Sequence, residues 1–311
     1  MFEGEIVRLT GVGRRLSIVL VLAVLCGVIG GSSASAKAPS GDFAIFGQCP
    51  RFTAGVSLCF YSQVTGGTIT LGKQTVPIDA DGQHAIVLQG GVEQQEVPFT
   101  ETFVGALNGE TISKTPQSVS GGLAGAVNCN EIPGNGILKV LGRTICQELL
   151  RGKLTSLSAT TELAGPASSI LINRRNLVVE EGTALSVPVK VHLENPLLGR
   201  ECYIGSDQAP IVLNFTTGTT SPAKPNEPIK GHIGEIKAKD EFNFVEVPDT
   251  VLVENEFSAP QATGCGGILS FLIDPLIDQK IGLPSPDGNN TAIQDINLYE
   301  ATSQAVTASE Q

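Results

Sequence analysis

The residues best placed to do chemistry in this chain are its cysteines, and the chemistry they indicate is disulfide formation. Six of the seven follow residue 36, namely Cys49, Cys59, Cys129, Cys146, Cys202 and Cys265. Nearest-neighbour pairing predicts Cys49 with Cys59, Cys129 with Cys146 and Cys202 with Cys265, one of fifteen possible connectivities. A zinc site is the alternative, but no Cys-x-x-Cys pair occurs, so structural disulfides are favoured.

Calcium is the metal for which the sequence offers ligands. Asp79-x-Asp81-Gly82 places two carboxylates beside a turn glycine, which is the local spacing of a calcium loop. A full EF-hand loop beginning at Asp79 needs a carboxylate at its twelfth position, which is Gly90. Asp79 and Asp81 therefore form an incomplete candidate site, against the alternative of a plain turn, and we expect no cofactor.

The sequence offers few candidate residues for nucleophilic catalysis. The three histidines, His84, His192 and His232, are scattered, with no His-x-x-x-His spacing. Ser57 follows Gly55 but lacks the second glycine of a Gly-x-Ser-x-Gly nucleophile turn. We interpret these side chains as surface, packing or strand residues and expect no catalytic residue among them.

Paired carboxylates could support glycoside hydrolysis, and Asp274 with Asp278 or Glu254 with Glu256 are the nearest pairs. Sugar sites usually present aromatic platforms, whereas this chain has no Trp and only three Tyr. The pairs are therefore interpreted as solvated acidic faces, and the sequence favours a non-enzymatic protein over an enzyme.

An export signal is predicted over residues 1–36. Arg14 and Arg15 precede an apolar run of about 14 residues, followed by small residues that end in Ala34-x-Ala36. The alternative is an uncleaved anchor, but the run is shorter than the roughly 20 residues of a spanning helix. We expect cleavage after Ala36 and a secreted or extracytoplasmic protein.

The charge of the remaining chain excludes several partners. From Lys37 onward there are 29 acidic and 17 basic residues, and most of the excess lies in the second half. Nucleic acids and anionic membrane surfaces both attract a basic face, so neither is an expected partner. The acidic half either contacts a basic partner or, as we favour, is a solvated exterior.

The hydrophobic pattern predicts the elements that must position these residues. Apolar and polar residues alternate over residues 185–193, which is typical of a half-buried strand, and Pro188 suggests a sheet edge. Residues 68–71 and 74–78 flank Gly72-Lys73 as a hairpin. The predicted fold is mainly all-β, with two β-sandwich-like lobes, residues 37–165 and the acidic 166–311, stapled by disulfides.

One or two short helices are expected within this β framework. Thr144 and Gln147 form a capping box, and Gly152 can end the helix that follows them. A second helix is predicted from about Gly267 to Lys280, with Pro275 at its start or at a kink.

Three stretches carry a resemblance: Gly41–Pro50 (GDFAIFGQCP), Leu141–Leu150 (LGRTICQELL) and Ala262–Gly267 (ATGCGG). They resemble segments of uncharacterised secreted proteins from high-GC Gram-positive bacteria. The resemblance implies a bacterial, extracytoplasmic setting and brings no activity with it.

The sequence therefore favours a secreted or envelope-associated β protein that acts by binding or structural association. Its expected partner is a cell-envelope component or another extracellular protein, and its ligand is not indicated. Two alternatives stay open at this point. An envelope pore or channel subunit would need strands of about nine to eleven residues and an aromatic girdle, yet aromatics are 5% of the chain. A secreted hydrolase would need a site that the motifs do not show.

Overall fold

The computed structural model describes residues 37–78, 85–93, 100–122, 129–132, 135–137, 139, 140, 142–144, 147 and 156–310. The predicted signal with its cleavage point at Ala36 lies outside these residues, as do Asp79, Asp81, His84 and Cys146. Residues Lys37–Gln311 form one compact unit. The boundary expected near Gly165 falls inside this unit.

The described chain is mainly β, as predicted, with fourteen strands in one antiparallel sheet. The strands are β1 (Val56–Leu71), β2 (Gln74–Pro77), β3 (Val87–Glu93), β4 (Glu101–Gly105), β5 (Pro116–Ser118), β6 (Ser158–Leu163), β7 (Leu171–Ile172), β8 (Leu185–Glu194), β9 (Tyr203–Ile204), β10 (Ile211–Phe215), β11 (Lys237–Lys239), β12 (Phe244–Glu254), β13 (Ala262–Thr263) and β14 (Thr291–Thr302).

Short helices accompany the sheet. The α-helices are α3 (Arg174–Val179), α4 (Ser270–Ile281) and α5 (Ser303–Ala308), and the 3-10 turns are η1 (Gly41–Phe46), η2 (Cys129–Glu131), η3 (Ala167–Ser169), η4 (Asp240–Phe242) and η5 (Gly267–Leu269). Within the described chain, no helix is long and apolar enough to cross a membrane. The helix expected after Thr144 falls mostly outside the described residues.

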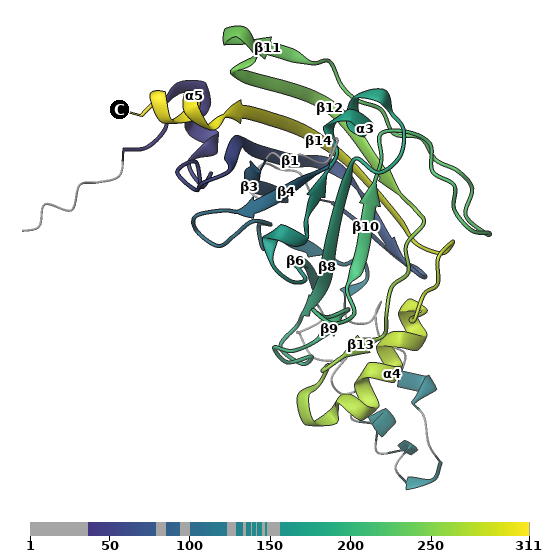
Figure 1. Ribbon diagram of the computed structural model, residues 1–311. Helices are drawn as coiled ribbons and strands as arrows, with labels where there is room; N and C mark the ends of the chain where they lie inside the picture. Colours follow the sequence, from purple (N-terminus) through teal and green to yellow (C-terminus); the bar gives the residue numbers. More distant parts are fainter. Residues whose placement is uncertain are drawn as a thin grey trace, which may run out of the picture. The chain divides into compact units, whose positions relative to one another are not determined.

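The sheet returns to its starting strand. Its central order is β12-β14-β1-β3-β4-β7-β8, and β10 pairs with the other side of β8. Directly after β10, Thr216 and Val253 of β12 exchange two backbone hydrogen bonds of 3.0 and 2.9 Å. Figure 1 shows β1, β12 and β14 facing β6, β8 and β10, the sandwich-like arrangement that the sequence predicts.

Strand alternation decides which side chains enter the space between these facing strands. In β8, Val187, Val189, Val191 and Leu193 are buried in the main core, whereas alternate positions from Lys190 onward are partly exposed. Each inward residue removes apolar surface from water, the main stabilising term of such a core. The strand predicted over residues 185–193 is thereby confirmed.

Pro188 corrects one expectation. The strand that contains it is not an edge strand, because β8 pairs with β10 on one side and with β6 and β7 on the other. Proline lacks only the N–H donor, and the Pro188 carbonyl still accepts a hydrogen bond of 3.0 Å from the Ala164 N–H. A central position is therefore tolerated at this point.

Two disulfides are confirmed in the pairing that the sequence predicts. Cys49 is bonded to Cys59, and Cys202 is bonded to Cys265. Cys129 is also disulfide-bonded, while Cys146, its expected partner, lies outside the described residues. Such bonds are typical of an oxidising, extracytoplasmic compartment.

The Cys49–Cys59 bond belongs to a second, smaller apolar cluster on the outer face of β1 and β14. Phe46, Val56, Phe244 and Val306 pack there with the disulfide. The ring of Phe244 meets that of Phe46 edge-on, with centroids 6.0 Å apart. This cluster joins both ends of the unit to the sheet, because η1 and α5 supply part of it.

The predicted second helix is present as η5 followed directly by α4. Pro275 lies inside α4 and not at its start. Gly282 ends the helix in the left-handed region, with φ +85°, as is usual for a glycine C-cap.

Candidate functional site

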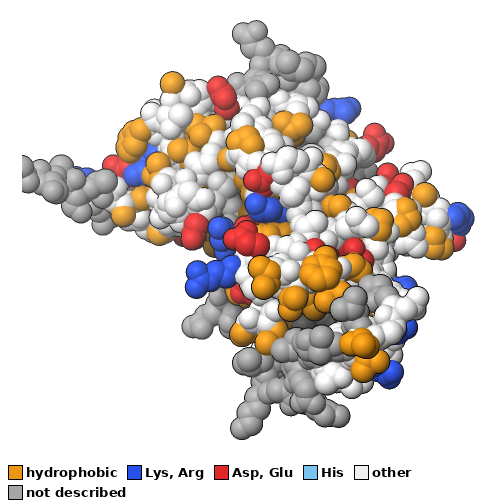
Figure 2. Space-filling model, turned by 90° about the horizontal axis from the view of Figure 1, so that it is seen from below, with side chains coloured by type: hydrophobic (Ala, Val, Ile, Leu, Met, Phe, Trp, Pro, Cys, Tyr) orange, Lys and Arg blue, Asp and Glu red, His pale blue; other side chains and the backbone are white. Residues whose placement is uncertain are grey.

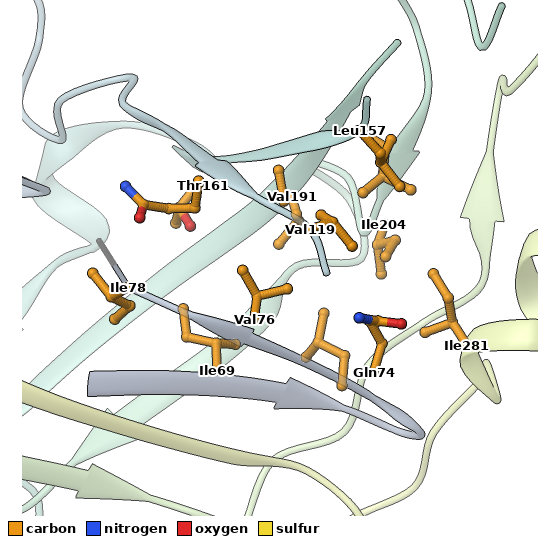
Figure 3. A pocket seen from close by; sticks show the side chains of 14 residues that line it. Ile69, Gln74, Val76, Ile78, Val119, Leu157, Thr161, Val191, Ile204 and Ile281 are labelled. Atoms are coloured by element: carbon orange, nitrogen blue, oxygen red, sulfur yellow. The ribbon is translucent and has the colours of Figure 1, made fainter. Parts of the chain in front are cut away.

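An apolar cavity, which we call cavity A, lies between the β1–β2 hairpin and strands β5, β6, β8 and β9. Its volume is about 50 Å³. Figure 3 shows the lining side chains converging on this space from both sides. The lining residues are Ile69, Leu71, Gln74, Val76, Ile78, Gln117, Val119, Leu157, Ala159, Thr161, Val191, Leu193, Ile204 and Ile281.

The hairpin that forms one wall is the one predicted from the sequence. Its register pairs Leu71 with Gln74 and Ile69 with Val76. Residues directly opposite each other point to the same face, so all four side chains face the cavity while Thr75 and Pro77 are exposed.

The end of α4 closes the cavity against this hairpin. The Lys73 N–H donates to the Ile281 carbonyl at 2.6 Å, and the Gly72 N–H donates to Asn290 Oδ1 at 2.9 Å. Gly72 has φ +56°, and a Cβ there would lie 2.5 Å from the Ile281 carbonyl oxygen. Only glycine permits this approach, which places the Ile281 side chain at the cavity wall.

A second cavity, cavity B, adjoins the first, because Ile69 and Thr161 line both. Its volume is about 60 Å³. Its other lining residues are Ser62, Val64, Ile86, Leu88, Ile112, Leu185, Val187, Val189, Leu213, Phe215, Leu252 and Gln294. The two cavities share this part of their walls, and each has a mainly apolar lining with few polar groups.

The chemistry of cavity A follows from its lining. Eleven of its fourteen side chains are apolar, and the exceptions are Gln74, Gln117 and Thr161. Figure 3 places Gln74 beside Ile281 and Thr161 on the opposite strand wall. A space of this kind favours an apolar occupant, because a water molecule needs two to four polar partners.

The opposite end of the interior is charged. Arg174 of α3 donates from Nε to Glu101 Oε2 at 2.7 Å and also bonds Glu101 through Nη2. Glu300 of β14 lies 3.6 Å from the same guanidinium. Burial raises the pKa of the Glu300 carboxyl, and nearby Arg174 only partly opposes this.

Carboxylates from both pairs considered for glycoside hydrolysis accept hydrogen bonds from backbone N–H groups instead. Asp274 accepts from the Cys265 N–H at 2.8 Å, and Asp278 accepts from the Ala262 N–H at 2.7 Å, so both tie α4 to the neighbouring β13 segment. Burial raises the pKa of both carboxyls. Glu254 accepts from the Asn214 N–H at 2.8 Å and helps to join β12 to β10.

Of the histidine and serine candidates, Ser57, His192 and His232 lie within the described residues, and each has its own partners. Ser57 Oγ donates to the Val92 carbonyl over 3.5 Å. His192 stacks on Tyr203 with ring centroids 4.5 Å apart, and its Nδ1 lies 3.7 Å from a carboxylate oxygen of Glu162. His232 pairs through its backbone with β12.

No metal centre is formed by the residues that the structure describes, since none of their His, Cys, Asp and Glu side chains gather in threes or more around a common point. The candidate calcium ligands Asp79 and Asp81 lie outside those residues. They are not tested by the structure.

The fold and cavities define a class of protein: a mainly β, disulfide-linked chain whose sheet returns on itself around apolar space. Comparison of the chain with protein families, with curated proteins and with solved structures finds no match.

Sequence reasoning identified several cavity-lining strands without identifying the cavity. The alternation in residues 185–193 marks Val191 and Leu193 as inward, and the hairpin pattern does so for Ile69 and Val76. Alternation does not show whether inward side chains fill the space between them. That depends on residues far apart in sequence.

Proposed function

We propose that this protein is a secreted or envelope-associated, non-enzymatic binding protein that holds a small apolar molecule, or the end of an alkyl chain, in cavities A and B. The observation that carries the proposal is the adjoining pair of cavities with an almost wholly apolar lining. The disulfides support an extracytoplasmic setting.

Size sets the ligand class. A cavity needs about 10–15 Å³ to hold one water molecule. Cavities of about 50 and 60 Å³ therefore admit a narrow occupant of a few carbon atoms each. An unbranched chain that runs past Ile69 and Thr161 would fill both, whereas a broad or strongly polar ligand would not fit.

Binding is expected to follow chain length. Each methylene moved from water into the interior contributes about 0.8 kcal/mol, so affinity should rise by roughly fourfold per carbon until the space is full. The carbonyls and amides of the surrounding strands are mostly paired within the sheet. Specificity therefore comes from length and width.

Thermal unfolding with a series of straight-chain alcohols tests the proposal. A ligand that binds only the folded state raises Tm, and the rise should grow with chain length and then level off. The cavity-filling substitution Ala159→Val should reduce this rise, whereas Ala238→Val, the same change on exposed β11, should retain it. Equal behaviour of both variants, or no rise for any alcohol, would overturn the proposal.

A further inference from the structure

Turn η5 and the first turn of α4, which follows it directly, expose three large apolar side chains that we call the α4 tip. Ile268 is 93% exposed, Phe271 is 69% exposed and Leu269 is 39% exposed. In Figure 2 hydrophobic side chains gather on the face seen from below, the side on which α4 lies in Figure 1. Contiguous apolar side chains left in water mark a contact surface.

The α4 tip carries no charge. Residues 257–273 contain no Asp, Glu, Lys or Arg, although such residues make up 16% of the chain. A charged partner would find nothing on this segment to pair with. The occupant that fits it is therefore an uncharged, apolar one.

The backbone beneath the α4 tip is firmly held. Cys265 is bonded to Cys202, and the Gly266 N–H donates to the Leu198 carbonyl at 2.7 Å. Asp274 accepts from the N–H groups of both Gly264 and Cys265. These ties fix the backbone from which the apolar side chains project into water.

The exposed apolar area of the α4 tip argues against a second copy of the chain as its partner. The three side chains expose roughly 400 Å² in total, from their exposed fractions and the 150–250 Å² that large side chains present. A stable protein interface needs about 800 Å² from each partner. Insertion among lipid headgroups requires only a few apolar side chains and no matching protein surface.

The same helix connects the α4 tip to the binding cavity. The twelfth and last residue of α4 is Ile281, which lines cavity A. We propose that the α4 tip inserts into an uncharged lipid surface and that the apolar occupant of cavities A and B is a lipid chain taken from that surface. The choice of lipid rests on the proposed function, whereas insertion of the tip stands on its own observations.

Sedimentation with phosphatidylcholine vesicles tests insertion. The purified protein should pellet with the vesicles, and the double substitution Ile268→Ser with Phe271→Ser should weaken partitioning by roughly tenfold or more, since a buried Phe alone contributes about 1.5–3 kcal/mol. Phe242→Ser is the matched control, because Phe242 is 71% exposed on η4, outside the tip. It should pellet like the wild type.

The outcomes separate this inference from the proposed function. No pelleting, equal losses in the tip and control variants, or binding that requires phosphatidylserine would overturn insertion by the apolar tip. The alcohol-dependent rise in Tm is measured without vesicles and should persist in the tip variant. Vesicle binding together with a flat alcohol series would support the tip and overturn the lipid-chain occupant.

Discussion

The two ends of the interior bury opposite kinds of side chain: charged groups at one end and apolar groups at the other. At one end Arg174, Glu101 and Glu300 are held together by directional, charge-assisted contacts. At the other end the side chains around Ile281 leave space, and nothing but apolar contact decides what fills it.

This difference indicates which end is adaptable. A buried ionic cluster tolerates loss of its cation poorly, because removing Arg174 leaves two carboxylates uncompensated. An apolar cavity tolerates emptying and filling at a smaller energetic cost, which is what a binding site needs. Under the proposed function, binding therefore belongs to the α4 end and rigidity to the α3 end.

The largest expected effect comes from the disulfide at the α4 end. Cys202→Ser with Cys265→Ser opens a bond that spans 63 residues, for which chain entropy predicts a loss of about 4 kcal/mol of unfolding free energy. Cys49→Ser with Cys59→Ser opens one that spans 10 residues, with an expected loss of nearly 3 kcal/mol. Urea denaturation of both variants measures the difference. A smaller loss at Cys202–Cys265 would show that the adaptable end does not depend on this constraint.

The charged end is tested by Arg174→Met. The substitution keeps the side-chain length but leaves the Glu101 and Glu300 side chains, 8% and 14% exposed, without their cation. Loss of a buried partner costs about 3–5 kcal/mol, and because the Arg174 side chain is 37% exposed we expect about 2 kcal/mol.

Two readouts check the Arg174→Met result. Arg175→Met, on an exposed side chain of the same helix, should change the unfolding free energy by under about 1 kcal/mol. Alcohol binding should survive Arg174→Met in the protein that remains folded. Loss of binding together with stability would show that the two ends are one site.

The two ends differ in how much of their structure could be predicted from the sequence. The hairpin and the β8 pattern follow from local spacing and were predictable, and the two disulfides agree with nearest-neighbour pairing, one of fifteen possible connectivities. The charged cluster was not, because Glu101, Arg174 and Glu300 come from three distant segments and carry no motif. Closure of the sheet through Thr216 and Val253 was equally hidden, since alternation shows the face of a strand but not its neighbour.

The same limit explains the unexpected joining of the two halves. β1 pairs with β14 along most of its length, with Leu58 opposite Thr302. Each predicted lobe holds an even number of cysteines and could close its own disulfides, yet each confirmed disulfide is also compatible with a shared sheet. Cysteine parity constrains which cysteines pair and leaves strand pairing open.

The smallest expected effect concerns Glu300. It tests whether Arg174 fully compensates the buried charge of this carboxylate. Burial raises the pKa of Glu300 above its ordinary value of 4.5, so the folded protein retains a proton that the unfolded chain has lost. Stability from this group is therefore present at low pH and is lost as pH rises through the raised pKa. Glu300→Gln cannot titrate and should gain about 1 kcal/mol over the wild type at pH 7, with no gain near pH 4.

Urea denaturation at several pH values measures this gain in unfolding free energy. A double variant shows how much of it depends on Arg174. In an Arg174→Met background the nearby cation is absent, so Glu300→Gln should be more stabilising there than in the wild type. A gain of the same size in both backgrounds would mean that Arg174 compensates only Glu101. A loss of stability in either would mean that the Glu300 charge is favourable, and the charged end would then be held by two ion pairs around one guanidinium.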